Sequence, residues 1–201
     1  MQEIFTDIYR RNLWAGSESA SGPGSGLERT SVFRVEMAQL LQDFTVRTLL
    51  DAPCGDFNWM RAVPLSLDHY FGIDIVEELI AGNRQKYGRV DRTFLCCDMT
   101  WENLPRTDLI LCRDGLVHFS FADIHQTLQN FKSSGAKYLL TNTFINVTEN
   151  DDVPTGGWRQ LNLEIAPFNF PPPISLIDEK CTHTNGRYRD KRLALWELSS
   201  S

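Results

Sequence analysis

The sequence predicts an α/β fold in which a mostly parallel sheet of seven strands carries helices on both faces. Short apolar segments alternate with amphipathic ones between Val46 and Asn142, which is typical of strands joined by crossover helices. Two further apolar segments near the end of the chain predict an antiparallel hairpin at the edge of the sheet. The 201 residues are 42% hydrophobic, enough for one substantial core, so we expect a single domain.

The predicted strands are short segments rich in Leu, Ile, Tyr and Phe. They cover residues 46–51, 69–74, 92–98, 107–113 and 137–142, followed by the hairpin strands 174–177 and 192–198. A polar stretch, 182–190, separates the last two and suits a hairpin turn.

Residues 76–86 and 121–131 have helical spacing. In the second segment Ile124, Leu128 and Phe131 fall at i, i+4 and i+7, with polar residues between them. Asp123 suits the first turn of this helix, and Gly135 suits its C-terminal stop.

A segment rich in glycine and serine, residues 17–27, precedes a segment of helical periodicity, 27–41. Its composition is typical of a flexible linker. Its place between an aromatic residue and a helix start favours a second interpretation, in which backbone N–H groups face an anion. We therefore predict that it caps a ligand pocket, with Trp14, Ser21, Gly22 and Ser25 in contact with the ligand.

The first predicted strand ends at an acid, Asp51, and the chain then turns through Gly55. A second acid, Asp74, ends the next strand nineteen residues after that glycine. This is close to the ~20 residues expected between a glycine turn and a ribose-binding acid. The spacing predicts a nucleotide-type pocket.

The chemistry of that turn narrows the ligand class. Asp56 and Asn58 stand where a dinucleotide-binding loop carries further glycines, and no Gly-Lys-Ser/Thr follows, which excludes a P-loop. Carboxylates attract an ammonium or sulfonium group and repel a pyrophosphate. The turn therefore favours a cationic ligand over a dinucleotide.

Composition and charge exclude several partners. Twenty basic and twenty-six acidic residues give a net charge of −6, and no basic stripe indicates nucleic-acid binding. No apolar run approaches the ~20 residues that span a bilayer, and the N-terminus does not resemble a signal peptide. The five cysteines contain no Cys-x-x-Cys pair, so we expect reduced, mostly buried thiols, a cytoplasmic protein and no metal site.

His118 is the predicted catalytic base, because it follows the fourth strand in RDGLVHF. If a helix begins near Asp114, His118 lies one turn later on the same side, where Asp114 orients the imidazole or itself acts as base. The alternative is a packed, hydrogen-bonded histidine. Of the other histidines, His69 is interpreted as a strand-edge residue, His125 as a helix-surface residue and His183 as a loop residue.

Four segments in order resemble the motifs of class I S-adenosylmethionine-dependent methyltransferases. They are DAPCGD (51–56), GID (72–74), CDM (97–99) and DLILCRD (108–114). The resemblance implies a Rossmann-like fold with S-adenosylmethionine as cofactor, Asp74 on the ribose and Asp98 on the adenine. The family's second glycine is absent, with Asp56 in its place. The cofactor-binding residues implied along these motifs are Asp51, Pro53, Gly55, Asp56, Asp74, Ile75, Asp98, Met99 and Arg113.

The flanking segments NLW (12–14), SGPGS (21–25), TGGWR (155–159) and PFNFP (167–171) resemble a smaller group, the sugar O-methyltransferases of large algal viruses. This implies methylation of a sugar hydroxyl, for example of rhamnose, in glycan biosynthesis. The host cytoplasm is then the expected location, either as a free protein or as the terminal domain of a glycosyltransferase.

The polar, Pro/Gly-rich segment 151–173 follows the fifth strand and is expected at the C-terminal edge of the sheet. In this interpretation it binds the acceptor, with Trp158 and Phe168 stacking on the sugar and Arg159 and Asn162 bonding its hydroxyls. The alternative is a loop whose aromatic residues close the core. Asp151 and Asp152 as a divalent-ion site are the less favoured interpretation.

The expected layout is thus a cap and helix (1–45), a cofactor-binding core (46–142), an acceptor-side insertion (151–173) and a terminal hairpin (174–201). Three alternatives remain at this level: methylation of a small metabolite, methylation of a protein side chain, and a non-catalytic cofactor-binding module. An NAD-dependent oxidoreductase is disfavoured because the acid-rich turn lacks the glycines for a pyrophosphate.

Overall fold

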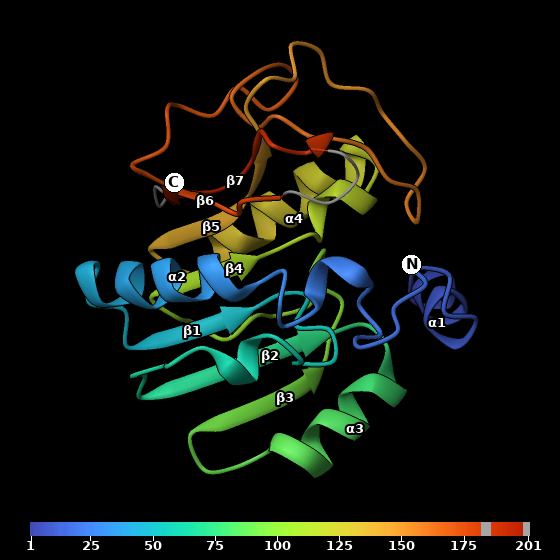
Figure 1. Ribbon diagram of the computed structural model, residues 1–201, viewed down its shortest axis with the longest axis vertical. Helices are drawn as coiled ribbons and strands as arrows, with labels where there is room; N and C mark the ends of the chain where they lie inside the picture. Colours follow the sequence, from blue (N-terminus) through green and yellow to red (C-terminus); the bar gives the residue numbers. More distant parts are fainter. Residues whose placement is uncertain (182–185, 199–201) are drawn as a thin grey trace.

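The computed structural model describes residues 1–181 and 186–198 and contains one seven-stranded sheet of order β3-β2-β1-β4-β5-β7-β6. This order runs from β3 near the bottom of Figure 1 to β5, β7 and β6 towards the top. The strands are β1 (Thr48–Asp51), β2 (His69–Asp74), β3 (Arg92–Cys96), β4 (Leu109–Cys112), β5 (Tyr138–Phe144), β6 (Ser175–Asp178) and β7 (Lys191–Glu197).

The directions of the strands confirm the predicted fold class. β1 pairs in parallel with β2 and β4, β2 with β3, and β4 with β5. β7 runs antiparallel to both β5 and β6, as expected of a terminal hairpin. Part of the predicted turn between them, residues 182–185 with His183, lies outside the described residues.

The helices cover both faces of this sheet. They are α1 (Gln2–Arg10), α2 (Ser31–Asp43), α3 (Glu77–Tyr87) and α4 (Phe121–Ser133). The chain steps from β1 to β3 in one direction and from β4 to β5 in the other. Because crossovers between parallel strands are right-handed, α3 and α4 lie on opposite faces. α4 begins at a Ser120 cap and ends before Gly135, which adopts a φ of +76°.

Helix α1 was not predicted from the sequence. Its nine residues bury Phe5 and Ile8, and it lies beyond the arrowheads of β1 to β3 in Figure 1. Arg10 Nε donates to Glu78 at 3.0 Å, and Gln2 Nε2 donates to the Ile75 carbonyl at 3.2 Å. A helix this short is marginal alone, so these tertiary contacts determine whether it forms.

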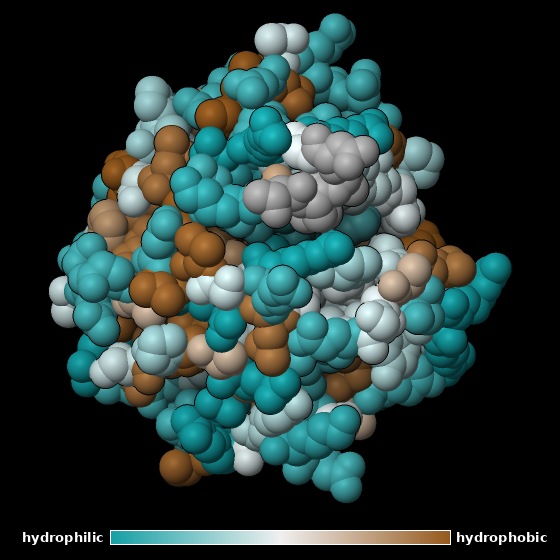
Figure 2. Space-filling model, in the orientation of Figure 1, coloured by the Kyte–Doolittle hydropathy of each residue, from teal (hydrophilic) through white to brown (hydrophobic). Residues whose placement is uncertain are grey.

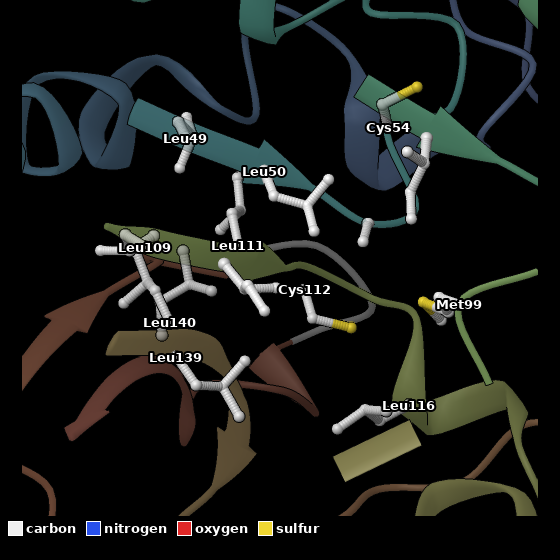
Figure 3. Packing of buried hydrophobic residues seen from close by; sticks show 14 of the residues in the cluster. Leu49, Leu50, Cys54, Met99, Leu109, Leu111, Cys112, Leu116, Leu139 and Leu140 are labelled. Carbon is white, nitrogen blue, oxygen red and sulfur yellow. The ribbon is translucent and has the colours of Figure 1, made fainter. Parts of the chain in front are cut away.

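The core lies around the central strands. Figure 3 shows leucines of β1, β4 and β5 packed together, and those that it labels are fully buried: Leu49, Leu50, Leu109, Leu111, Leu139 and Leu140. Close packing of branched side chains makes these strands rigid. The loops that follow their carboxyl ends are therefore held on a fixed base.

The surface is mixed in character. Apolar side chains lie among polar ones over the face that Figure 2 shows. Within the described ranges no helix has the length and apolar character needed to cross a membrane. All five cysteines are free thiols, and only Cys96 is partly exposed.

Candidate functional site

A cavity of about 340 Å³ opens where the carboxyl ends of β1, β2 and β4 meet α1 and the glycine-rich segment. The structure brings most of the predicted site residues into its wall: Trp14, Ser21, Gly22, Ser25, Pro53, Gly55, Asp74, Ile75, Asp98, Met99, Arg113, Asp114, His118 and Trp158. Five others do not line it: Asp51, Asp56, Arg159, Asn162 and Phe168.

The turn after β1 is joined to the end of β2. Gly55 N donates to Asp74 Oδ2 at 3.2 Å, and Val76 N donates to Asp74 Oδ1 at 3.0 Å. Gly55 has a φ of +54°, and a Cβ there would lie 2.1 Å from Ser21 Oγ. Glycine therefore suits both the positive φ of the turn and the close approach of the glycine-rich segment.

Two carboxyl groups at this turn, the buried Asp51 and the half-buried Asp74, have raised pKa values. Burial raises the pKa of Asp51 to about 7, although the Tyr70 hydroxyl donates to it at 2.7 Å. Burial likewise raises the pKa of Asp74 to about 6, against the backbone N–H groups that favour its charged form. Asp74 faces the cavity, whereas Asp51 lies behind its wall.

Asp98 lies in the wall after β3, beside Met99. One of its oxygens, Oδ1, already accepts hydrogen bonds from Thr100 N at 3.0 Å and Thr100 Oγ1 at 2.6 Å. These bonds fix the orientation of the carboxylate in the cavity.

Asp56, which replaces the second glycine of the turn, binds the glycine-rich segment. Its carboxylate accepts hydrogen bonds from Ser19 Oγ at 2.9 Å and from Ala20 N at 2.8 Å. Nearby, Asn58 Nδ2 donates to Glu18 at 2.9 Å and to the Ser25 carbonyl at 3.1 Å. The segment predicted to be a cap is therefore fastened to the turn, and Asp56 serves that contact.

We expect Asp56→Ala to release this segment. Loss of both acceptor oxygens leaves the Ala20 amide without its partner and lowers the free energy of unfolding by about 1–3 kcal/mol. Hydrogen exchange at Ala20 N measures the effect directly. Glu28→Ala, which removes an exposed acid of the same region, is the control. Unchanged exchange at Ala20 in the Asp56 variant would contradict this role.

A buried cluster of charges forms the wall beyond β4. Arg113 Nη2 lies 2.7 Å from Glu179, and the Lys191 ammonium lies 2.6 Å from Asp114 and 3.4 Å from Glu179. The Arg113 guanidinium also lies over the ring of Phe33 at 4.7 Å. Two cations and two anions compensate one another, which is the condition for burying charge.

Sequence reasoning missed Glu179 and Lys191. Both belong to the terminal hairpin, which the antiparallel pairing of β7 with β5 brings beside Arg113 and Asp114. Periodicity predicts the strands of this hairpin, whereas the strand order and side-chain directions that bring the two residues here required the structure.

The chain between β4 and α4 differs from expectation. Asp114 adopts a φ of +56°, and the next turn is a short 3-10 helix, η3 (Leu116–His118), rather than an α-helix from Asp114. The Asp114 amide donates to the Asn142 side chain, and this bond holds the unusual backbone. Burial favours the neutral acid, but Lys191 and Arg113 outweigh it and hold the pKa of Asp114 well below its usual range.

His118 reaches the cavity from the end of η3. Its Nδ1 lies 2.7 Å from the Gly157 carbonyl, so Nδ1 carries the proton and Nε2 carries the lone pair. No described residue hydrogen-bonds to Nε2. The Trp14 ring packs at 5.2 Å, and burial lowers the pKa of the imidazole from its ordinary value. The site thus presents a neutral imidazole with a free acceptor nitrogen.

An aromatic group from three segments lies in the same wall. Trp158 packs against Tyr188 at 5.2 Å and against Phe144 at 6.3 Å, measured between ring centroids. All three line the cavity together with His118. They combine an apolar surface with nearby charged groups.

The remaining insertion residues lie elsewhere. Phe168 packs on Phe121 and His125 of α4. Asn162 joins the insertion to the chain just after β5 by donating to the Val147 carbonyl at 2.9 Å. Asp152 accepts from the Phe121 amide at 2.8 Å. Across residues 1–181 and 186–198 no group of three His, Cys, Asp or Glu side chains could hold a metal ion.

Comparison with known proteins gives likeness in structure alone. No family model matches the sequence, and no curated protein matches it. Magnesium protoporphyrin IX methyltransferase from Synechocystis PCC 6803, solved with bound S-adenosylmethionine, superposes with a TM-score of 0.63 at 15% identity, covering 98% of this chain and 97% of that one. The N-methyltransferase NodS from Bradyrhizobium japonicum WM9 gives 0.53 at 10% identity, covering 81% and 94%.

These superpositions extend over most of both chains. At such low identity the likeness concerns the fold and leaves the residues of the site to be judged on their own chemistry. This chain therefore has the fold of S-adenosylmethionine-dependent methyltransferases.

Proposed function

We propose that the protein is an S-adenosylmethionine-dependent O-methyltransferase that methylates a sugar hydroxyl of a glycan. The observation that carries the proposal is the position of His118. His118 lines a cavity whose wall also contains the ribose-binding candidate Asp74 and the aromatic group of Phe144, Trp158 and Tyr188, and its Nε2 carries no hydrogen bond from a described residue.

The residues at the turn fit the cofactor. Asp74 offers carboxylate oxygens to ribose hydroxyls, while Ile75 and Met99 offer apolar surface to an adenine beside Asp98. The carboxyl-rich wall suits a sulfonium charge. When bound, S-adenosylmethionine supplies an electrophilic methyl group on that sulfonium.

His118 is the proposed general base. An alcohol becomes a good nucleophile as its proton leaves, and Nε2 can accept that proton while Nδ1–H remains bonded to Gly157. The nearby Asp114 carboxylate favours the imidazolium that forms. Asp114 itself is a poor base, because the cations that lower its pKa also occupy its oxygens.

The acceptor side fits a carbohydrate. Sugars present an apolar ring face and several hydroxyls, and aromatic side chains such as Trp158 bind the first while charged groups bind the second. Lys191 and Asp114 lie in the same cavity wall as the aromatic group. Arg159, Asn162 and Phe168, which sequence reasoning assigned to the acceptor, do not line the cavity, so the proposed acceptor contact in the insertion is Trp158.

Cofactor affinity is expected to rise with pH. Ribose hydroxyls donate to an ionised carboxylate, and the pKa of Asp74 is about 6 in the folded protein, so binding at lower pH must expel a proton. The dissociation constant should increase by about tenfold per pH unit below 6. Calorimetry between pH 5 and 8 in two buffers measures both affinity and proton release. Asp74→Asn should make the cofactor affinity nearly independent of pH. A wild-type affinity that rises as the pH falls would contradict the prediction.

The proposed function is tested in two stages. Calorimetry with S-adenosylmethionine tests the cofactor, and absence of binding would end the proposal. Methyl-labelled cofactor is then incubated with rhamnose-containing glycans, small-molecule acceptors and peptides, and NMR identifies the methylated atom. Transfer to a sugar oxygen supports the proposal. Methyl transfer only to small molecules or only to peptides would show that the acceptor is not a sugar. Cofactor binding without any methyl transfer would indicate a non-catalytic module.

A further inference from the structure

Residues 156–159 of the insertion run beside η3. Gly156 N donates to the His118 carbonyl at 2.8 Å, and Arg159 N donates to the Val117 carbonyl at 3.2 Å. The Gly157 carbonyl accepts the His118 imidazole proton between these two bonds. The turn that carries the proposed base is therefore attached to the insertion through its backbone and through its imidazole.

The Arg159 side chain adds a further bond to the same turn. Its Nη1 donates to the carbonyl of Leu116, the first residue of η3, at 2.9 Å. The guanidinium carbon lies 5.5 Å from the Phe121 ring centroid, just beyond the turn. Arg159 thus contacts the chain on both sides of His118.

This arginine is buried at a cost. It is 6% exposed, and neither Nε nor Nη2 has a hydrogen-bond partner in the described structure. No described carboxylate lies within ion-pair distance of it, and Asp152 attracts it only over a longer range. A buried cation without a paired anion is destabilising. Stability alone does not explain a buried cation at this position, and its contacts point to a role at the neighbouring site.

The charges around His118 define that role. Asp114 favours the protonated imidazole, whereas Arg159 and Lys191 oppose it and burial opposes it most. Lys191 already forms close ion pairs with Asp114 and Glu179. Arg159 is the cation near His118 whose charge is not cancelled by such a pair.

We propose that Arg159 is a positioning residue for His118, which holds η3 against the insertion so that Nδ1–H binds Gly157 and Nε2 stays unprotonated toward the cavity. Its catalytic consequence rests on the proposed role of His118 as base. Its structural consequence, the tautomer and charge of His118, is independent of that role.

The test compares Arg159→Met, which removes the charge and the donors, with Arg159→Lys, which keeps a cation able to reach a carbonyl. Arg11→Met, at the exposed arginine that follows the last residue of α1, is the matched control. Imidazole ¹⁵N NMR follows the tautomer and titration of His118, assigned by comparison with His118→Asn. We expect Arg159→Met to raise the midpoint of the His118 titration and weaken the Nδ1–H form, and Arg159→Lys to restore the midpoint.

Activity provides the second readout. The acid limb of the pH–rate profile should shift upward with Arg159→Met, with kcat reduced by about 10–100-fold and the KM for S-adenosylmethionine unchanged. If Arg159→Met does not fold, Arg159→Lys provides the test. The proposal requires the His118 titration midpoint of Arg159→Lys to stay close to that of the wild type, and a shifted midpoint would contradict it. Unchanged tautomer and titration in a folded Arg159→Met would overturn the proposal. Wild-type protein without transferase activity would instead overturn the proposed function, with the NMR result unaffected.

Discussion

His118→Asn is expected to lower kcat by about 10²–10⁴-fold while cofactor affinity stays unchanged. Asparagine is close in size and can still donate to the Gly157 carbonyl, so the turn is preserved and the base alone is lost. Transfer rates with labelled S-adenosylmethionine, together with calorimetry of the variant, separate the two effects.

The matched control is His125→Asn, at a histidine of α4 that packs on Phe168 and does not line the cavity. It should retain wild-type kcat. Since Asp114 is the other candidate base, a His118→Asn enzyme with full activity would return that role to Asp114 and refute the proposed mechanism.

Arg113→Met is expected to lower the free energy of unfolding by about 3–5 kcal/mol, because it leaves Glu179 buried without its main counterion. The side chains of Arg113 and Glu179 are 5% and 1% exposed, so water cannot replace the lost partner. Urea denaturation monitored by tryptophan fluorescence measures the change.

Two further variants show whether the pair is the cause. Arg47→Met breaks an ion pair with Asp68 whose side chains are 59% and 58% exposed, and should cost less than about 1 kcal/mol. Adding Glu179→Gln to Arg113→Met should recover part of the loss, since the stranded charge is removed. A loss in Arg113→Met no larger than that in Arg47→Met would contradict the assignment.

The sheet could be predicted from the sequence because strand and helix periodicities are local. The apolar runs ending at Asp51 and Asp74 each form a buried parallel strand, and the spacing of the glycine turn places both acids at one edge. α1 escaped prediction because nine residues are stabilised by distant contacts, such as the ion pair of Arg10 with Glu78.

The sequence predicted which residues lie at the site better than it predicted what those residues contact. His118 lies in the cavity wall, but its orientation depends on Gly157, which is distant in sequence and contributes only a backbone carbonyl. Asp56 and Arg159 were expected to contact ligands because of their chemistry, and the structure shows them bound to neighbouring loops. A residue type indicates what a side chain can bind, whereas the fold determines which partner lies within reach of it.

The alternation of residues 157 to 159 has a consequence for how such an enzyme can diversify. Gly157 and Arg159 attach the insertion to the turn of His118, while Trp158 between them lines the cavity. Selection for a new acceptor can therefore act on position 158 without disturbing the base, whereas exchange of the whole loop would remove both at once. In the proposed mechanism, acceptor preference and proton transfer therefore share one short segment yet are separable residue by residue.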